Sequence, residues 1–274
     1  MMSGMSIDSL SLWEFFLATV VFVFLFIEAG FLLGRRHRHK DTALESSVNA
    51  MAGATAGLLA FMLAFTFGSA ASRHDSRKQL VIEEANAIRT TYLRAGLLPG
   101  PHREEIRRLL REYVDIRVKA VQMEKAEIQQ ALVRSEELQE QLWAQAVAAS
   151  QVTPGSVTTG IFIQSLNELI QLHLKRLTVG IRNRVPGTIW GTLYSLAALA
   201  MFMMGYRAGL VGSRSRLISL ALVLSFSGVI FLIADLDRPQ QGLIRVSQQA
   251  MTELQNRLGK DTASSVPGHK QSNE

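Results

Sequence analysis

Residues 12–34, LWEFFLATVVFVFLFIEAGFLLG, form an almost unbroken apolar stretch near the start of the chain. A helix needs about 20 apolar residues to cross the hydrocarbon core of a bilayer, and this stretch supplies them. No Lys or Arg precedes it, and the basic run RRHRHK at residues 35–40 follows it in place of a small-residue cleavage site. The stretch therefore predicts a first transmembrane helix rather than a cleaved signal peptide.

Three further stretches have the same apolar character, at residues 50–71, 188–206 and 217–236. Of the 274 residues 48% are hydrophobic, and yet 19% are charged. Such a mixture indicates apolar spans joined to a separate polar part. The fold class that we predict is all-α: an integral membrane protein with four transmembrane helices and an inserted amphipathic helical bundle.

The inserted part lies between the second and third spans. Apolar residues recur there at helical spacing, with Glu and Arg on the other faces. The stretches LLPGPH (97–102), SQVTPGS (150–156) and RVPGT (184–188) each contain a Pro-Gly or Gly-Pro pair, which interrupts a helix. We therefore expect a bundle of about three long helices, the first of them continuous with the second span.

These boundaries divide the chain into six segments. We predict an N-terminal tail (1–11), transmembrane helices 1 and 2 (12–71), a helical extramembrane domain (72–187), transmembrane helices 3 and 4 (188–236), a turn with an amphipathic segment (237–259), and a disordered tail (260–274).

Basic residues in the short loops predict the orientation, because such loops face the cytoplasm. They follow the first span and the third span: Arg35, Arg36, Arg38, Lys40, Arg207, Arg214 and Arg216. The N-terminal tail has no Lys or Arg. The helical domain and the C-terminus are therefore predicted to lie outside the cytoplasm. The net charge of +6 fits contacts with lipid headgroups better than nucleic-acid binding.

Small residues gather near one face of the second span: Gly53, Gly57, Ala64 and Gly68. Because small residues let helices approach closely in lipid, we expect this face to pack against another helix. The opposite face is lightly polar and carries Thr55, Thr66 and Ser69, with Phe61 and Phe65 on its shoulder. Such a helix can line a pore in which phenylalanines form a dewetting constriction. The alternative is ordinary helix packing, with each Thr hydroxyl bonded to its own backbone.

Two groups of charges near the spans each allow a functional and a structural interpretation. Glu28 lies inside the first span, either as an ion-sensing or pore-lining carboxylate or as a group that reaches the interface or pairs with an Arg. Residues 77–99 include Glu83 and Glu84 with Arg89 and Arg94. This run is either a solvated helix face or a polar vestibule at a pore mouth.

The fourth span ends in FLIADLDRPQQG, residues 231–242. Proline disfavours further helix there, and acids at a helix C-terminus oppose its dipole. Asp235 and Asp237, beside Arg238, should therefore have partners elsewhere. We predict a structural clasp in which they pair with Arg89 or Arg94, and the alternative is a charged ring at a pore mouth.

Several classes of chemistry find no support in the sequence. The chain has no cysteine, which excludes disulfides and thiolate sites. Its six histidines do not cluster, and it has no phosphate loop, dinucleotide fingerprint, zinc-protease motif or nucleophile elbow. We therefore expect no enzyme activity, no cofactor and no metal site.

Three stretches resemble the bacterial bestrophin-like membrane family: IEAGFLLGRR (27–36), EEANAIRTTYLRAGLLP (83–99) and ADLDRPQQGLIRVS (234–247). These four-span proteins are considered distant relatives of the bestrophin anion channels. The resemblance implies the bacterial inner membrane, a homo-oligomer and by analogy a pentamer, with the second span lining the pore and Phe61 and Phe65 in its neck.

The chain also departs from bestrophins proper. Gln240 and Gln241 stand where an aromatic residue of a Pro-Phe-Gly-like turn would be, and no run of acids resembles a calcium clasp. Bestrophins keep the helical body in the cytoplasm, whereas the basic loops here predict the opposite. Two hypotheses follow. The first is a passive ion channel, anion-selective by resemblance. The second is a non-conducting membrane scaffold or envelope sensor whose helical domain binds a partner.

Overall fold

The structure is a computed structural model, and it describes residues 11–37, 42–121, 123, 125–179, 184–212, 216–238 and 242–264. Within these ranges every regular element is a helix, which confirms the predicted fold class. The chain divides into two compact units. Unit 1 comprises Met1–His74 and Asn183–Arg245, and unit 2 comprises Asp75–Arg182 and Val246–Glu274.

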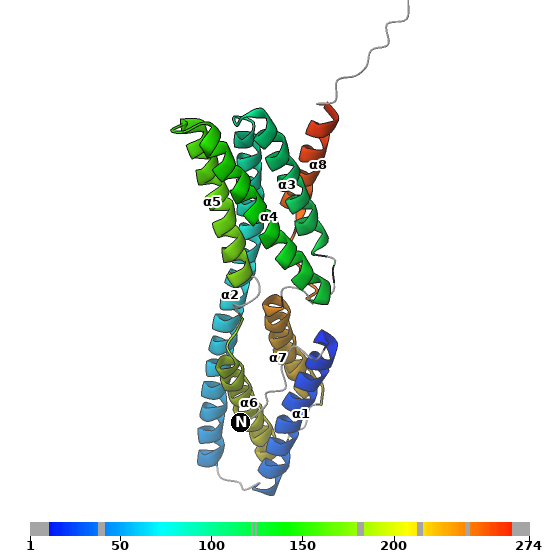
Figure 1. Cartoon of the computed structure of the whole chain (residues 1–274). Helices are drawn as coiled ribbons and strands as arrows, with labels where there is room; N and C mark the ends of the chain where they lie inside the picture. Colours follow the sequence, from blue (N-terminus) through cyan, green and yellow to red (C-terminus); the bar gives the residue numbers. More distant parts are fainter. Residues whose placement is uncertain are drawn as a thin grey trace, which may run out of the picture. The chain divides into compact units, whose positions relative to one another are not determined.

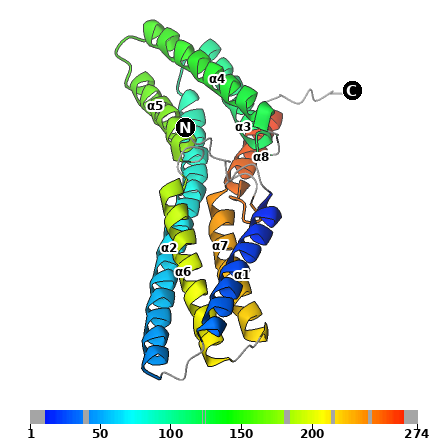
Figure 2. The same cartoon turned by 90° about the horizontal axis from the view of Figure 1, so that it is seen from below.

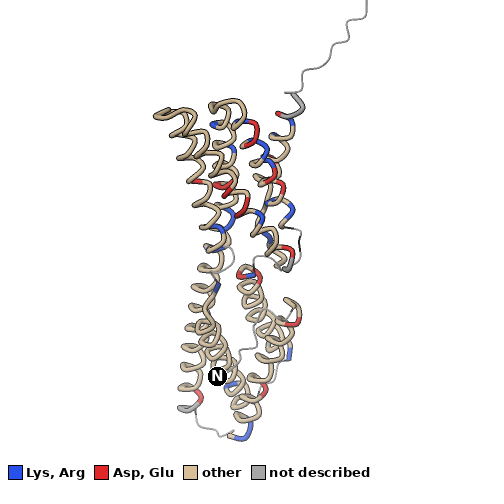
Figure 3. The backbone as a smooth tube through the Cα atoms, in the orientation of Figure 1, with Lys and Arg blue, Asp and Glu red and all other residues tan. Residues whose placement is uncertain are grey.

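Unit 1 holds the four predicted spans. They are α1 (Leu12–Arg36), the first part of α2 (Thr42–Ala95), α6 (Gly187–Val211) and α7 (Arg216–Asp237). All four are long and apolar enough to cross a membrane. They lie side by side in Figures 1 and 2, and Figure 3 shows few charges along their length.

Helix α1 starts at a capping box. The Ser11 hydroxyl accepts a hydrogen bond from the Glu14 amide, and the Glu14 carboxylate accepts one from the Ser11 amide. These two bonds satisfy backbone donors that a helix start leaves without partners. The capping box thus fixes where the first span begins.

Close helix contact in unit 1 occurs between α1 and α6. A Cβ atom built on Gly30 would overlap the carbonyl oxygen of Phe202, and one on Gly205 would overlap that of Ile27. Only glycine allows this backbone approach, which is how helices pack in lipid. Among the described residues of unit 1, the close small-residue contact therefore lies between the first and third spans.

Unit 2 holds the rest of α2 with α3 (Gly100–Lys119), α4 (Lys125–Val152), α5 (Val157–Leu177) and α8 (Gln249–Ser264). One apolar cluster joins all five, with members such as Ile88, Leu110, Leu142, Leu166 and Leu254. The expected continuity of the second span with the first helix of this unit is confirmed, since α2 runs unbroken to Ala95.

Two of the predicted boundaries are wrong. We expected one helix between the two Pro-Gly breaks at 97–102 and 150–156, but α3 ends at Lys119 and α4 begins at Lys125. The reversal lets α3 and α4 pack against each other and share the apolar cluster. The predicted tail also begins too early, because α8 continues to Ser264, and residues 265–274 lie outside the described part.

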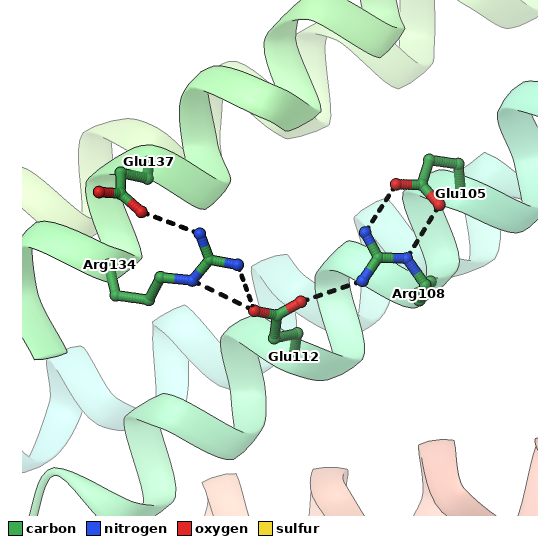
Figure 4. A network of polar contacts seen from close by, with 5 residues as sticks. All are labelled: Glu105, Arg108, Glu112, Arg134 and Glu137. Carbon is green, nitrogen blue, oxygen red and sulfur yellow. Dashed lines mark hydrogen bonds and ion pairs between the residues drawn. The ribbon is translucent and has the colours of Figure 1, made fainter.

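An ion-pair network fixes α3 beside α4 (Figure 4). Arg134 of α4 donates to Glu112 of α3 at 2.5 Å and to Glu137 at 2.8 Å. Glu112 also accepts from Arg108, which binds Glu105 at 2.7 Å. The hydrogen bond from Arg134 holds the pKa of Glu112 below its ordinary value, so the network stays ionised at neutral pH.

Candidate functional site

Helix α2 has a packed side and an open side within unit 1. The packed side carries the buried residues Ala52, Leu59, Leu63, Thr66 and Ala70. On the open side Phe61 and Phe65 are each 66% exposed. Two large aromatic side chains on one uncovered face of a span need an environment other than this chain's own helices.

The small-residue face of α2 is open within unit 1. We predicted that Gly53, Gly57, Ala64 and Gly68 pack against another helix. A Cβ atom on any of these three glycines would meet nothing within 4 Å, and Ala64 is exposed. The larger side chains of Leu59 and Leu63 give more buried apolar surface, and they carry the packing instead.

The hydroxyl residues on this helix follow the structural interpretation. Thr66 is buried and donates to the Met62 carbonyl at 2.7 Å, so it faces the chain's own helices. Thr55 donates to the Met51 carbonyl at 3.0 Å, and Ser69 is half-buried. Of the polar residues predicted to line a pore, Thr66 is therefore excluded. Glu28, on α1, is half-buried.

The acids at the end of α7 form a clasp with partners in unit 1, in place of the predicted Arg89 or Arg94 of the helical domain. Asp237 accepts a hydrogen bond from the Val185 amide at 2.9 Å and lies 3.9 Å from the Arg73 guanidinium. Asp235 accepts from the amides of Leu243 at 2.6 Å and Ile244 at 3.0 Å. Both carboxylates thus bind segments of unit 1, namely the chain before α6, α2 near its middle, and the turn after α7.

The predicted partners of this clasp are wrong. Arg94 donates to the Ile161 carbonyl at 2.9 Å within unit 2, and Arg89 is exposed. Both acids accept hydrogen bonds from backbone amides within unit 1, so they need no side chain from the helical domain. Arg238 lies over the Phe15 ring, 5.6 Å from its centroid. Pro239, Gln240 and Gln241 lie outside the described residues.

A buried ion cluster lies in unit 2, and we call Glu84, Tyr113, Arg117, His173 and Arg176 the Glu84 cluster. Arg117 lies 3.1 Å from the Glu84 carboxylate, and Arg176 also pairs with it. The Tyr113 hydroxyl donates to Glu84 at 2.8 Å. The cluster ties α2 to α3 and α5, so the interpretation of Glu84 as part of a solvated face is wrong.

The charges in the Glu84 cluster shift its titration. Burial opposes ionisation of Glu84, but Arg117 and Arg176 outweigh it and lower the pKa to about 2. Burial, helped by the charge of Arg117, lowers the pKa of His173 to about 4. Burial also raises the pKa of Tyr113. At neutral pH the cluster holds one anion, two cations and a neutral imidazole.

The hydrogen bonds also fix the tautomer of His173. Its Nδ1 lies 2.9 Å from the Tyr113 hydroxyl, which has already given its only proton to Glu84. Nδ1 must therefore carry the imidazole proton and donate it. Nε2 is then a bare acceptor, and it has no hydrogen-bond partner among the residues that the structure describes.

Sequence reasoning missed most of this cluster. It singled out Glu84, but not Tyr113, Arg117, His173 or Arg176. Each of these four occupies a position with ordinary helical spacing, and only His173, a lone histidine within an apolar repeat, gave a weak signal. Among the described residues, no group of three or more His, Cys, Asp or Glu could hold a metal ion.

Comparisons with known proteins agree with this architecture. A family model described as "Bestrophin-like domain" matches residues 15–251. A search of curated proteins finds no match.

Solved structures with a similar fold include a bacterial bestrophin homologue from Klebsiella pneumoniae. It has a TM-score of 0.63 and 17% identity, over 91% of this chain and 97% of that one. A variant of that homologue has a TM-score of 0.62 and 16% identity, over 90% and 98%. A structure described as a membrane protein has a TM-score of 0.65 and 15% identity, over 91% and 97%.

Proposed function

Because the chain belongs to the bestrophin-like family, we propose that it forms a homo-oligomeric passive ion channel that conducts anions. Four helices long and apolar enough to cross a membrane support a multi-pass protein. The family's association with anion channels supports the choice of an anion as the permeant ion. We do not expect the four packed helices of a single copy to enclose a pore along their axis. Conduction therefore requires several copies around a common axis, and a pentamer is the arrangement that the resemblance favours.

The observation that carries the proposal is the open face of α2, where Phe61 and Phe65 are each 66% exposed. Around an axis, copies of this face would form two successive rings of phenylalanine. Rings of this kind gate by excluding water until the pore widens. Gly57, Ala64 and Gly68 are exposed on the same helix, and their small size would let neighbouring helices approach closely.

The lining of the proposed pore differs from the one expected from sequence. Phe61 and Phe65 remain as the neck, while Thr66 leaves the lining because it is buried in the chain. Gly57 and Gly68 lie on the open face, where the helix predicted to pack against them would belong to another copy. This assignment makes Phe61 and Phe65 the residues whose truncation should change conduction most.

The proposed orientation follows the basic loops. Arg35 and Arg36 end α1, and Arg207 lies near the end of α6. We place these ends in the cytoplasm and the C-terminus outside it. A fusion of alkaline phosphatase after Glu274 should be active in bacteria. A fluorescent protein at the same site that folds in the cytoplasm would reverse the assignment.

Purified full-length protein in planar bilayers tests the function. We expect discrete conductance steps with a reversal potential that follows the chloride gradient, from particles with cyclic symmetry in detergent. Monomeric particles, or rings without conductance under any ion gradient, would contradict the channel. Rings without conductance would favour the scaffold or sensor, whose helical domain binds a partner.

A further inference from the structure

The turn that follows α7 is pinned to the end of that helix. Asp235 is buried, and each of its carboxylate oxygens accepts one backbone hydrogen bond, from Leu243 at 2.6 Å and from Ile244 at 3.0 Å. A Cβ atom on Gly242 would lie 2.8 Å from Asp235 Oδ1 and 2.9 Å from its carbonyl oxygen. The turn therefore sits so close to the helix that only glycine fits at its first position.

This pinned backbone presents apolar side chains outward. Leu243 is 66% exposed and Ile244 is 40% exposed, and the next residue, Arg245, is exposed as well. The backbone amides of the pair already have their partner in Asp235. What remains free is a rigid aliphatic pair followed by one positive charge.

The turn emerges at one end of the membrane spans. Arg238, the first residue after α7, lies over the Phe15 ring near the start of α1. The Trp13 ring lies 5.6 Å from the Phe231 ring, so the start of α1 and the end of α7 are at the same end. Trp13 is 60% exposed there, and tryptophan is enriched where a bilayer meets water.

We propose that the Leu243–Ile244 turn is an interfacial lipid anchor. Its two aliphatic side chains enter the boundary between headgroups and acyl chains, and Arg245 binds the phosphate of an anionic lipid. Two apolar residues followed by one basic residue suit the membrane interface, where acyl chains give way to anionic headgroups. The bilayer is the partner that we propose for these side chains, because the membrane span α7 ends only a few residues before the turn. The anchor does not depend on whether the protein conducts ions.

The absence of cysteine makes a direct test available, because one introduced cysteine is then the only labelling site. A nitroxide is attached to the full chain carrying Leu243→Cys, in bilayers of phosphatidylcholine and phosphatidylglycerol. Its collisions with oxygen, which concentrates in lipid, are compared with those of a water-soluble nickel chelate. Val21→Cys, exposed on α1, and Asn256→Cys, exposed on α8, serve as the lipid and water controls.

We expect the label at 243 to lie between the two controls in its preference for oxygen over nickel. A label as accessible to nickel as the one at 256 would overturn the anchor. So would a label shielded from both reagents and broadened by a second nitroxide, since a second copy of the chain would then cover the turn.

Two further variants in the Leu243→Cys background test its parts. Gly242→Ala should free the turn, giving a more mobile nitroxide and more nickel contact. An unchanged spectrum would refute the pinning. Arg245→Gln should make the label shallower when phosphatidylglycerol is present and leave it unchanged in phosphatidylcholine alone. Equal depth in both lipids would refute the phosphate contact.

Discussion

Removing the charge of Glu84 tests whether the Glu84 cluster holds unit 2 together. Glu84→Gln keeps the size of the side chain but leaves Arg117 and Arg176 without their carboxylate. Both guanidinium groups are largely buried, with side chains 7% and 16% exposed. Truncating one partner of a buried pair typically costs about 3–5 kcal/mol, because the other charge stays buried and unpaired.

The neighbouring acid provides a matched control. Glu83 pairs with Lys175 at 3.8 Å, but the two side chains are 37% and 61% exposed. An exposed pair of this kind contributes about 0–1 kcal/mol. Glu83→Gln changes the same residue type, one position away on the same helix. The structure thus predicts a large difference between two substitutions that look alike in the sequence.

Hydrogen exchange of the full-length protein, followed peptide by peptide, measures this difference within unit 2. Local and global opening set the exchange rate of buried amides. We expect amides of α3 and α5 in Glu84→Gln to exchange about a hundredfold faster or more, given the cost of an unpaired buried charge. Glu83→Gln should change them by less than about tenfold. Equal effects of the two substitutions would refute the role of the cluster.

Three further predictions concern the stability of the fold. Because burial and Arg117 lower the pKa of His173 to about 4, the unfolded state binds a proton first, so stability should fall as the pH drops from about 6.5 towards 4, by up to about 3 kcal/mol. His173→Gln should remove most of that slope in acid unfolding curves, and an unchanged slope would contradict the assignment. Gly205→Ala should destabilise unit 1 by about 1–3 kcal/mol through overpacking, whereas Gly228→Ala, with open space around it, should not; equal melting temperatures would argue against the α1–α6 contact. Asp237→Ala should cost about 1–3 kcal/mol in denaturant unfolding because it strands the buried Val185 amide, and no loss would show that the clasp is dispensable.

The membrane architecture was predictable from sequence because its signals are local. An apolar run of sufficient length needs no partner to be recognised, and Pro-Gly pairs interrupt helices wherever they occur. The break between α3 and α4 carries neither proline nor glycine. The chain reverses there so that the apolar faces of α3 and α4 pack against each other. Helical spacing continues on both sides of the break, so the sequence pattern does not reveal it.

The partners of individual side chains were not predictable in the same way. Spacing shows that Gly53 and Gly57 share a face, but not whether that face meets a helix of the same chain. The strongest ion cluster joins Glu84 to residues 33 and 92 positions later, Arg117 and Arg176. Such pairs depend on which helix faces meet, and that is decided by packing over the whole unit.

The central claim is that the open face of α2 lines an anion pore with Phe61 and Phe65 at its neck. Its most direct test is chloride efflux from liposomes that contain the full-length protein, the Phe61→Ala, Phe65→Ala double variant, or Leu32→Ala, which truncates an exposed residue on α1. The account predicts efflux from the first, faster efflux from the double variant, and no change for Leu32→Ala. Equal efflux from all three proteins, or none from any, would contradict it.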